Sequence, residues 1–196
     1  MDTDLRTTDP IRVGDWMITH SGRRFFPLDP RPTEVDFRDI GHALSLICRY
    51  GGHVRRFYSV AEHSTLLAQY FLDRGDFTWA RYALLHDAPE AYIGDMVRPL
   101  KVGMTLYKTA ERAVERAILR RAGLGDAPIP PEVDTADKAI VIDERAALFA
   151  PEVLEAANWY PKLAPLGVIV TGHPPHVAER DFASMLGRLF PELVAA

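Results

Sequence analysis

The stretch Leu84-Leu-His-Asp-Ala-Pro-Glu-Ala91 decides the fold prediction, because it ends an apolar helix on two adjacent metal-binding residue types. An apolar stripe that includes Tyr82 and Leu85 predicts a helix that ends near His86. Pro89 then interrupts the helical path, since proline cannot donate a hydrogen bond to the preceding turn. Imidazole and carboxylate groups both bind divalent first-row cations, and a buried carboxylate without a partner is strongly destabilised. The stretch therefore predicts a helical fold with a candidate metal site; a solvated pair at an exposed helix end is the alternative.

Apolar residues at three- and four-residue spacing predict further helices on both sides of this stretch. Ser59 is a candidate N-cap, and Glu62 three residues later completes the pattern of a capping box. Strand signals are few: residues 16–19 and 24–26 around a Ser-Gly turn predict a hairpin, and residues 168–170 are a further candidate. The predicted helices run from residue 37 to the glycine pair at 51–52 and over residues 59–71, 78–86, 88–94, 105–122, 134–150, 152–159 and 177–190.

The predicted architecture is therefore an all-α fold, a helical bundle with a short irregular or β-hairpin N-terminal segment. A chain of 196 residues suits one domain. We expect a single domain over residues 1–196, with an irregular arm over 1–36, where prolines and glycines interrupt regular structure, and a helical core over 37–196.

Composition and charge exclude several classes of protein. The chain has 23 Lys and Arg against 27 Asp and Glu, a net charge of −4, which argues against a dedicated nucleic-acid binder with a basic face. Its one cysteine, Cys48, cannot form an internal disulfide, so a secreted disulfide scaffold is not expected. No apolar run reaches the roughly 18 to 20 residues of a membrane-spanning helix, and no signal stretch opens the chain. The prediction is a cytoplasmic protein without membrane or nucleic-acid partners.

Acidic and basic residues follow His86 and Asp87 closely. Glu90, Asp95, Arg98 and Lys101 come within sixteen residues of His86, and Arg49, Tyr50 and His53 form a second polar group upstream. Carboxylates hold metals and orient water, whereas Arg and Lys bind phosphate oxygens. This combination favours phosphate ester hydrolysis over peptide or sugar chemistry.

Four segments carry a resemblance to a known family. They are Phe57-Tyr-Ser-Val-Ala-Glu-His-Ser64, Leu84-Leu-His-Asp-Ala-Pro-Glu-Ala91, Ile93-Gly-Asp-Met-Val-Arg-Pro-Leu-Lys101 and Val133-Asp-Thr-Ala-Asp-Lys138. Together they resemble the HD-domain metal-dependent phosphohydrolase superfamily, and in particular its branch of bacterial 5′-deoxynucleotidases and phage dATP triphosphohydrolases. The resemblance extends from about residue 36 to the last helix.

The resemblance implies a role for each candidate residue. The metal ligands would be His63, His86, Asp87 and Asp137, with Asp134 as the alternative to Asp137. Glu90 would orient or deprotonate the attacking water, and Asp95 would assist as general acid or base. Substrate-binding candidates are Arg49, Tyr50, His53, Arg98 and Lys101; Tyr50 occupies the place of a tryptophan in the deoxynucleotidases.

The expected function is thus hydrolysis of a nucleotide, with one divalent cation (Mn, Co, Fe, Zn or Mg) as cofactor. The substrate would be a 2′-deoxynucleotide: either a dNTP, giving deoxynucleoside and triphosphate, or a dNMP, giving deoxynucleoside and phosphate. The alternatives are a catalytically idle nucleotide-binding sensor with the same fold and a helical interaction module with a structural metal. Apolar stripes on the helices at 105–122 and at the C-terminus also predict a homo-oligomer, a dimer or higher.

Overall fold

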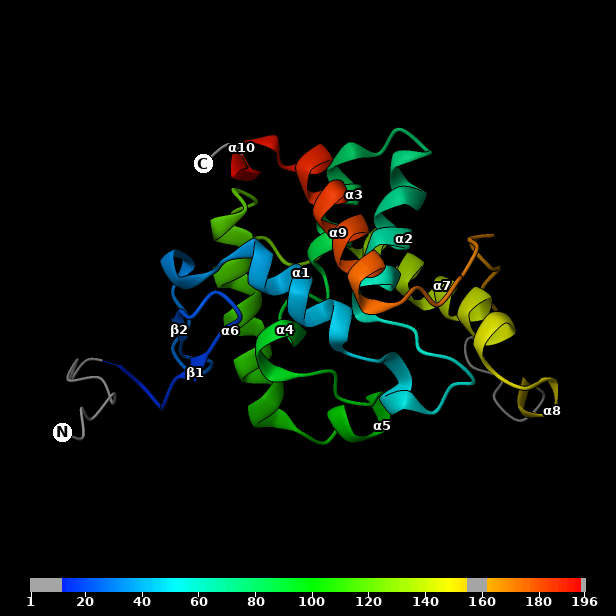
Figure 1. Ribbon diagram of the computed structural model, residues 1–196, viewed down its shortest axis with the longest axis horizontal. Coiled ribbons are helices and arrows are strands. Elements are labelled where there is room, and N and C mark those ends of the chain that lie inside the picture. Colours follow the sequence, from blue (N-terminus) through cyan, green and yellow to red (C-terminus); the bar gives the residue numbers. More distant parts are fainter. Residues whose placement is uncertain (1–11, 155–161, 195–196) are drawn as a thin grey trace.

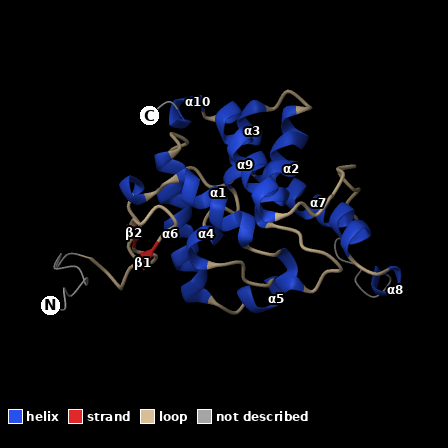
Figure 2. Cartoon of the chain, viewed as in Figure 1, coloured by secondary structure: helices blue, strands red, loops and turns tan. Residues whose placement is uncertain are grey.

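Helices dominate the computed structural model, which describes residues 12–154 and 162–194 (Figures 1 and 2). Helices contain 59% of the residues and strands 3%, which confirms the all-α class with a short N-terminal hairpin. The helices are α1 (Phe37–Leu46), α2 (Val60–Leu72), α3 (Phe77–Leu85), α4 (Glu90–Ile93), α5 (Arg98–Lys101), α6 (Thr105–Arg121), α7 (Pro131–Leu148), α8 (Pro151–Leu154), α9 (Pro175–Leu189) and α10 (Pro191–Val194), with 3-10 turns η1 (Pro32–Glu34) and η2 (Arg49–Gly52).

The long helices lie within a few residues of their predicted ranges, and the differences are local. The segment after α1 forms the separate turn η2, and the sequence did not predict the short helices α5 and α10. Residues 155–159 of the helix predicted at 152–159 lie outside the described residues. The strand predicted at 168–170 was wrong. These residues have no strand assignment, because no segment within residues 12–154 and 162–194 pairs with them, and the carbonyl of Val170 accepts a hydrogen bond from the Arg56 side chain instead.

The predicted hairpin is confirmed in the N-terminal segment. Strands β1 (Met17–Ile18) and β2 (Arg24–Phe25) pair antiparallel, with Met17 opposite Phe25. The turn between them is fixed to α1, because the Asp39 carboxylate accepts hydrogen bonds from the backbone N–H and the hydroxyl of Ser21, at 2.6 and 2.8 Å. The hairpin is therefore part of the folded body, next to the start of the bundle.

The hydrophobic core lies where α2 packs against α3 and α9, and α1 packs against α9 (Figure 1). Gly41 permits the closest approach of α1 to α9, because a Cβ there would lie 3.0 Å from the Phe182 ring. Ile40, Leu67 and Leu84 are fully buried in this core. Each such side chain contributes roughly 1.5–3 kcal/mol relative to an exposed one. This packing holds α2 and α3 side by side, which fixes the positions of the residues at their ends.

The capping box predicted at the start of α2 is confirmed for Ser59 and wrong for Glu62. The Ser59 hydroxyl accepts a hydrogen bond from the Glu62 N–H at 3.0 Å, as an N-cap does. The Glu62 carboxylate, however, does not complete the box. It accepts three backbone N–H groups from residues 171–173 at 2.6–3.0 Å, because the chain before α9 passes over this end of α2. Glu62 therefore joins distant parts of the chain directly beside His63.

Candidate metal centre

Four predicted ligands, from two helices and the turn that follows a third, meet at one point. His63 lies in the first turn of α2, His86 and Asp87 directly follow α3, and Asp137 lies in α7. One ligand atom from each residue falls within 4.8 Å of the others, so the group could hold a metal ion. The helix packing thus joins residues that are up to 74 positions apart (137 − 63).

The distances within this cluster are short. His63 Nε2 lies 3.2 Å from His86 Nε2 and 3.1 Å from an Asp137 oxygen. His86 Nε2 lies 3.2 Å from an Asp87 oxygen. The His63 side chain is fully buried, whereas those of Asp87 and Asp137 are 18% and 30% exposed. The cluster is therefore closed on the His63 side and open to solvent on the carboxylate side.

Hydrogen bonds set the orientation of both imidazole rings. His63 Nδ1 lies 2.6 Å from a Glu144 oxygen, and His86 Nδ1 lies 2.8 Å from the carbonyl of Ala83. Both partners are acceptors, so each Nδ1 carries a proton as the donor and each neutral ring directs the Nε2 lone pair into the cluster. Two lone pairs and two carboxylates then face one another, an arrangement that a divalent cation neutralises. The donor set fits a divalent first-row metal.

Without a cation, protons are the alternative counter-charge. Burial lowers the pKa of His86, but the Asp87 and Asp137 carboxylates raise it well above its ordinary value. A metal must therefore displace protons from this cluster when it binds.

The structure distinguishes the two candidate aspartates on α7. Asp137 faces the imidazoles, whereas Asp134 is exposed and pairs with Lys138 one turn along the same helix. Asp137 is therefore the cluster member, and Asp134 offers a matched control on the same helix.

Glu144 is the buried residue that the sequence analysis missed. It lies two turns after Asp137 on α7, and its side chain is fully buried. One carboxylate oxygen accepts hydrogen bonds from His63 Nδ1 and from the Tyr58 hydroxyl, at 2.6 and 2.9 Å, and the other accepts from the Tyr50 hydroxyl. Burial by itself raises the pKa of Glu144, but Arg49 and His63 lower it to about 2, so the group is a carboxylate at neutral pH.

Arg49 connects Glu144 to the candidate metal ligands. Its Nη1 donates to an Asp87 oxygen at 3.0 Å, and its Nη2 lies 3.6 Å from Glu144. The side chain is only 13% exposed, so both carboxylates act on it across a region of low dielectric. The predicted phosphate-binding arginine therefore lies directly beside the metal cluster.

Tyr50 is not an open stacking surface. Its backbone has φ 59°, the left-handed region that L residues rarely adopt, and such a conformation costs about 1–3 kcal/mol. Two contacts compensate: the hydroxyl bonds to Glu144, and the ring packs edge-on against Phe149 with centroids 5.3 Å apart. The strained turn η2 thus directs Tyr50 toward α7, where it positions Glu144.

Glu90 and Asp95 both lie close enough to Asp87 for its charge to act on them. Glu90 is 5% exposed, and its N–H donates to the carbonyl of Asp87 at 3.0 Å. Burial raises the pKa of Glu90 well above its ordinary value, and the charges of Asp87 and Asp95 raise it further. Burial likewise raises the pKa of Asp95. Carboxyl groups with raised pKa values beside a metal site are suited to holding and transferring protons near neutral pH.

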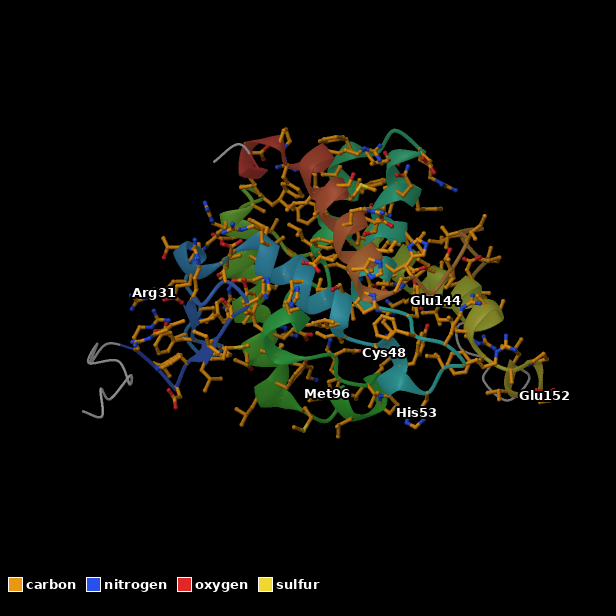
Figure 3. All side chains as sticks on the ribbon, in the orientation of Figure 1. Arg31, Cys48, His53, Met96, Glu144 and Glu152 are labelled. Carbon is orange, nitrogen blue, oxygen red and sulfur yellow. The ribbon has the colours of Figure 1, made fainter. Side chains whose placement is uncertain are left out.

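The remaining predicted substrate-binding residues lie farther out. Lys101 at the end of α5 pairs with Glu111, and its charge acts on Glu90 and Asp87. Arg98 begins α5 and is exposed. His53 is also exposed. It follows η2 at the edge of the molecule, whereas the site residue Glu144 lies on α7 (Figure 3). Among the five predicted binders, Arg49 and Tyr50 are thus joined directly to the site, and Lys101 acts on it through its charge.

Comparison with known proteins adds a family but no activity. Models of known protein families give no match to the chain.

Within the described part of the chain, no helix combines the length and apolar character needed to cross a membrane.

Two curated proteins are similar over most of the chain. An uncharacterized protein of Rhodobacter capsulatus is 37% identical over 130 residues, which span 63% of this chain and 66% of that protein, just under two thirds of its length. The uncharacterized protein YfdR of Escherichia coli (strain K12) is 37% identical over 134 residues, which span 66% of this chain and 70% of YfdR. By this identity and coverage, the chain belongs to the same protein family as YfdR.

Proposed function

We propose that the protein is a metal-dependent phosphohydrolase that acts on nucleotides, with 2′-deoxynucleotides as the expected substrates. The observation that supports this most is the convergence of two imidazole lone pairs and two carboxylates beside a buried arginine. A structural metal site usually has four tight ligands, commonly Cys and His, and is closed. Here Asp137 is 30% exposed, so the cluster is open on one side, as a catalytic site requires.

Two buried polar atoms on residues that contact Asp87 support a ligand at the cluster. Arg49 Nε and one oxygen of Glu90 are buried and have no hydrogen-bond partner among the described residues. Buried polar atoms are nearly always hydrogen-bonded, so such a pair beside a cation site fits the binding of water or a phosphate oxygen. Arg49 lies in η2 and Glu90 in α4, so two separate segments of the chain supply these atoms.

In the proposed reaction, the residues of the chain divide the work. A divalent cation held by His63, His86, Asp87 and Asp137 would supply Lewis acidity and lower the pKa of water toward 7. Arg49 would donate hydrogen bonds to the phosphoryl oxygens, and Lys101 would add positive charge nearby. Glu90 would accept the proton of the attacking water as the new P–O bond forms, and Asp95 would give a proton to the leaving ester oxygen as the old P–O bond breaks.

The test is a release screen with matched variants. Purified protein is incubated with ribo- and deoxynucleoside mono- and triphosphates, with and without Mn, Co, Fe, Zn or Mg, and phosphate and triphosphate are measured. We expect metal-dependent release that Asp87→Ala abolishes together with metal content, and that Asp134→Ala retains. Full activity of Asp87→Ala would remove the assignment of the site. Nucleotide binding without any release would favour the idle sensor instead. Cytoplasmic location and homo-oligomer formation stay predictions from the sequence.

A further inference from the structure

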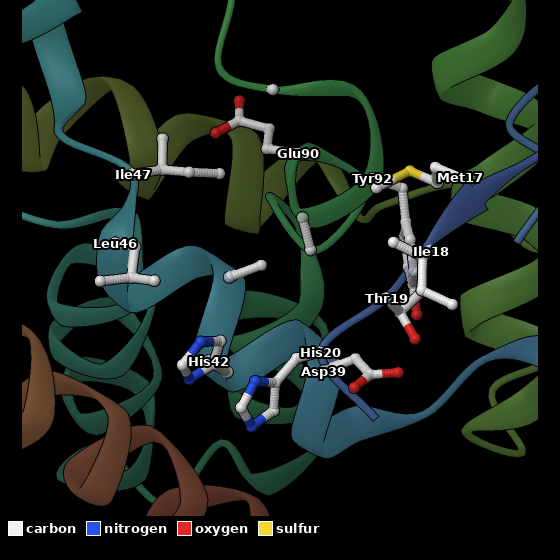
Figure 4. Close-up of a pocket in the computed structure, with 13 residues that line it drawn as sticks. Met17, Ile18, Thr19, His20, Asp39, His42, Leu46, Ile47, Glu90 and Tyr92 are labelled. Carbon is white, nitrogen blue, oxygen red and sulfur yellow. The ribbon is translucent and has the colours of Figure 1, made fainter. Parts of the chain in front are cut away.

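A pocket lies beside Glu90, and none of the predicted phosphate-binding residues Arg49, Arg98 and Lys101 lines it. It has a volume of about 560 Å³ and is bordered by the hairpin, by α1 and by α4. We call it the slot and define it by Ile18, His20, Ala43, Leu46, Ile47 and Glu90. Figure 4 shows Glu90 at one end, His20 and His42 at the other, and apolar side chains along both walls. Its volume is within the range of small-molecule sites, roughly 300–1,000 Å³.

Glu90 links the slot to the candidate metal centre. Glu90 forms its end, and the same residue donates its backbone N–H to Asp87, one of the four metal ligands. The Glu90 side chain is 5% exposed, and one of its oxygens has no hydrogen-bond partner within the described residues. The slot and the cluster therefore share Glu90, and a molecule that occupied both would contact this residue.

The charges of the slot determine which half of a substrate it can take. Among the described residues that line it, none is Lys or Arg, and two, Asp39 and Glu90, are acids that are at least 95% buried. A phosphate would find no cationic side chain there, whereas Arg49 and Lys101 act on Glu90 from outside the slot. The anionic half of a substrate thus belongs at the cluster, and an uncharged half belongs in the slot.

The far end of the slot is suited to a flat ring. His20 and His42 are stacked with ring centroids 3.6 Å apart and planes 18° from parallel. His42 is held in place by Glu179, which lies 3.2 Å from its Nδ1. The hairpin side is held by the bonds between Ser21 and Asp39. The slot is therefore preformed, with apolar walls for a sugar and a stacked imidazole pair for a heterocyclic base.

We propose that the slot binds the nucleoside half of the substrate, with the base against the His20–His42 pair and the phosphate at the metal cluster. The assignment rests on the proposed function. It makes the N-terminal hairpin part of the binding site and assigns base recognition to the hairpin turn and α1 instead of Tyr50.

The test separates the slot from the hydrolytic centre. Ala43→Phe narrows the slot from α1, and Ala183→Phe places the same ring on an exposed position of α9 as the matched control. Binding of deoxynucleosides, which carry no phosphate, is measured by calorimetry and by saturation-transfer NMR. Wild type and Ala183→Phe should bind with equal affinity, and Ala43→Phe should lose at least about tenfold. His20 is exposed, so His20→Ala should leave the fold intact, and it should also weaken nucleoside binding.

A second measurement uses hydrolysis. The KM for the best nucleotide should rise in Ala43→Phe and stay at the wild-type value in Ala183→Phe. Nucleoside binding that is unchanged in Ala43→Phe and His20→Ala would overturn the slot assignment. So would a change of oligomeric state in Ala43→Phe, seen by light scattering, without a change in nucleoside affinity. If no phosphate ester is hydrolysed with any cation, the proposed function fails, and the nucleoside measurement still decides the slot.

Discussion

Replacing Glu144 with glutamine should weaken metal binding although Glu144 is not a metal ligand. The substitution keeps the size of the side chain and removes its charge. In the wild type, one oxygen accepts the His63 Nδ1 proton at 2.6 Å while the other lies 3.6 Å from Arg49. An amide can serve only one of these groups: its NH₂ must face either Arg49, a donor, or His63 Nδ1. In the second case the His63 proton is driven to Nε2, the atom that faces the cluster.

The expected magnitudes follow from burial. Breaking a buried ion pair by removing one partner costs about 3–5 kcal/mol, but Arg49 keeps its bond to Asp87 at 3.0 Å. We therefore expect Glu144→Gln to lose about 2–3 kcal/mol of unfolding free energy, the value of a hydrogen bond to a charged group. Loss of the partner that orients a metal-binding histidine lowers metal affinity about 10- to 100-fold.

The assays are urea unfolding of the metal-free protein and competition with a metal-binding dye. Asp143→Asn is the matched control, because it is the same chemical change at the neighbouring residue of α7. The Asp143 carboxylate accepts the N–H groups of Leu166 and Gly167, at 2.8 and 3.1 Å, away from the cluster. Asp143→Asn should lower the unfolding free energy by about 1 kcal/mol and leave metal affinity unchanged. The reasoning is refuted if Glu144→Gln binds metal as tightly as Asp143→Asn does.

Three further predictions test the site and the fold around it. Asp137→Ala should lower metal affinity by more than about 100-fold, because a ligand is lost and not an orienting partner, whereas dye competition should show no change for Asp134→Ala. The hydrogen bond and charge of Arg38 hold the pKa of Asp36 below its ordinary value, so its stabilising contribution is complete above about pH 4 and is lost as the pH falls through the lower folded-state pKa. The difference in unfolding free energy between wild type and Asp36→Asn should therefore shrink from about pH 5 to pH 2, and a constant difference would contradict this cause. Ser59→Ala should reduce stability in urea by about 1 kcal/mol through loss of the α2 N-cap, and an unchanged midpoint would show that the cap contributes nothing.

Local sequence signals were sufficient for most of the helices. The spacing of apolar residues predicted α1, α2, α3, α6, α7 and α9, and Ser59 marked the start of α2, because helix periodicity and capping depend on residues three or four positions apart. The Ser-Gly turn likewise predicted the hairpin. The same signals failed at Glu62, whose side chain binds residues more than a hundred positions away instead of its own helix end.

The sequence predicted the candidate site only in part. The ligand set came from a resemblance to known motifs, and spacing alone left Asp134 and Asp137 as equal candidates. Glu144 follows Asp137 by two helical turns, so its shared face was visible in the sequence. Acidic residues on helices are nevertheless mostly solvated, and nothing local indicated that Glu144 is buried.

The sequence by itself determined an all-α chain with His and Asp at the helix ends, because those features depend on neighbouring residues. Tertiary structure alone decided that Asp137 meets His63, that Glu144 is buried against Arg49, and that the hairpin closes a slot next to Glu90. Each of these depends on the burial and packing of segments far apart in the chain. Burial sets whether a carboxylate is solvated, paired or available for a metal, and it is a property of the whole fold.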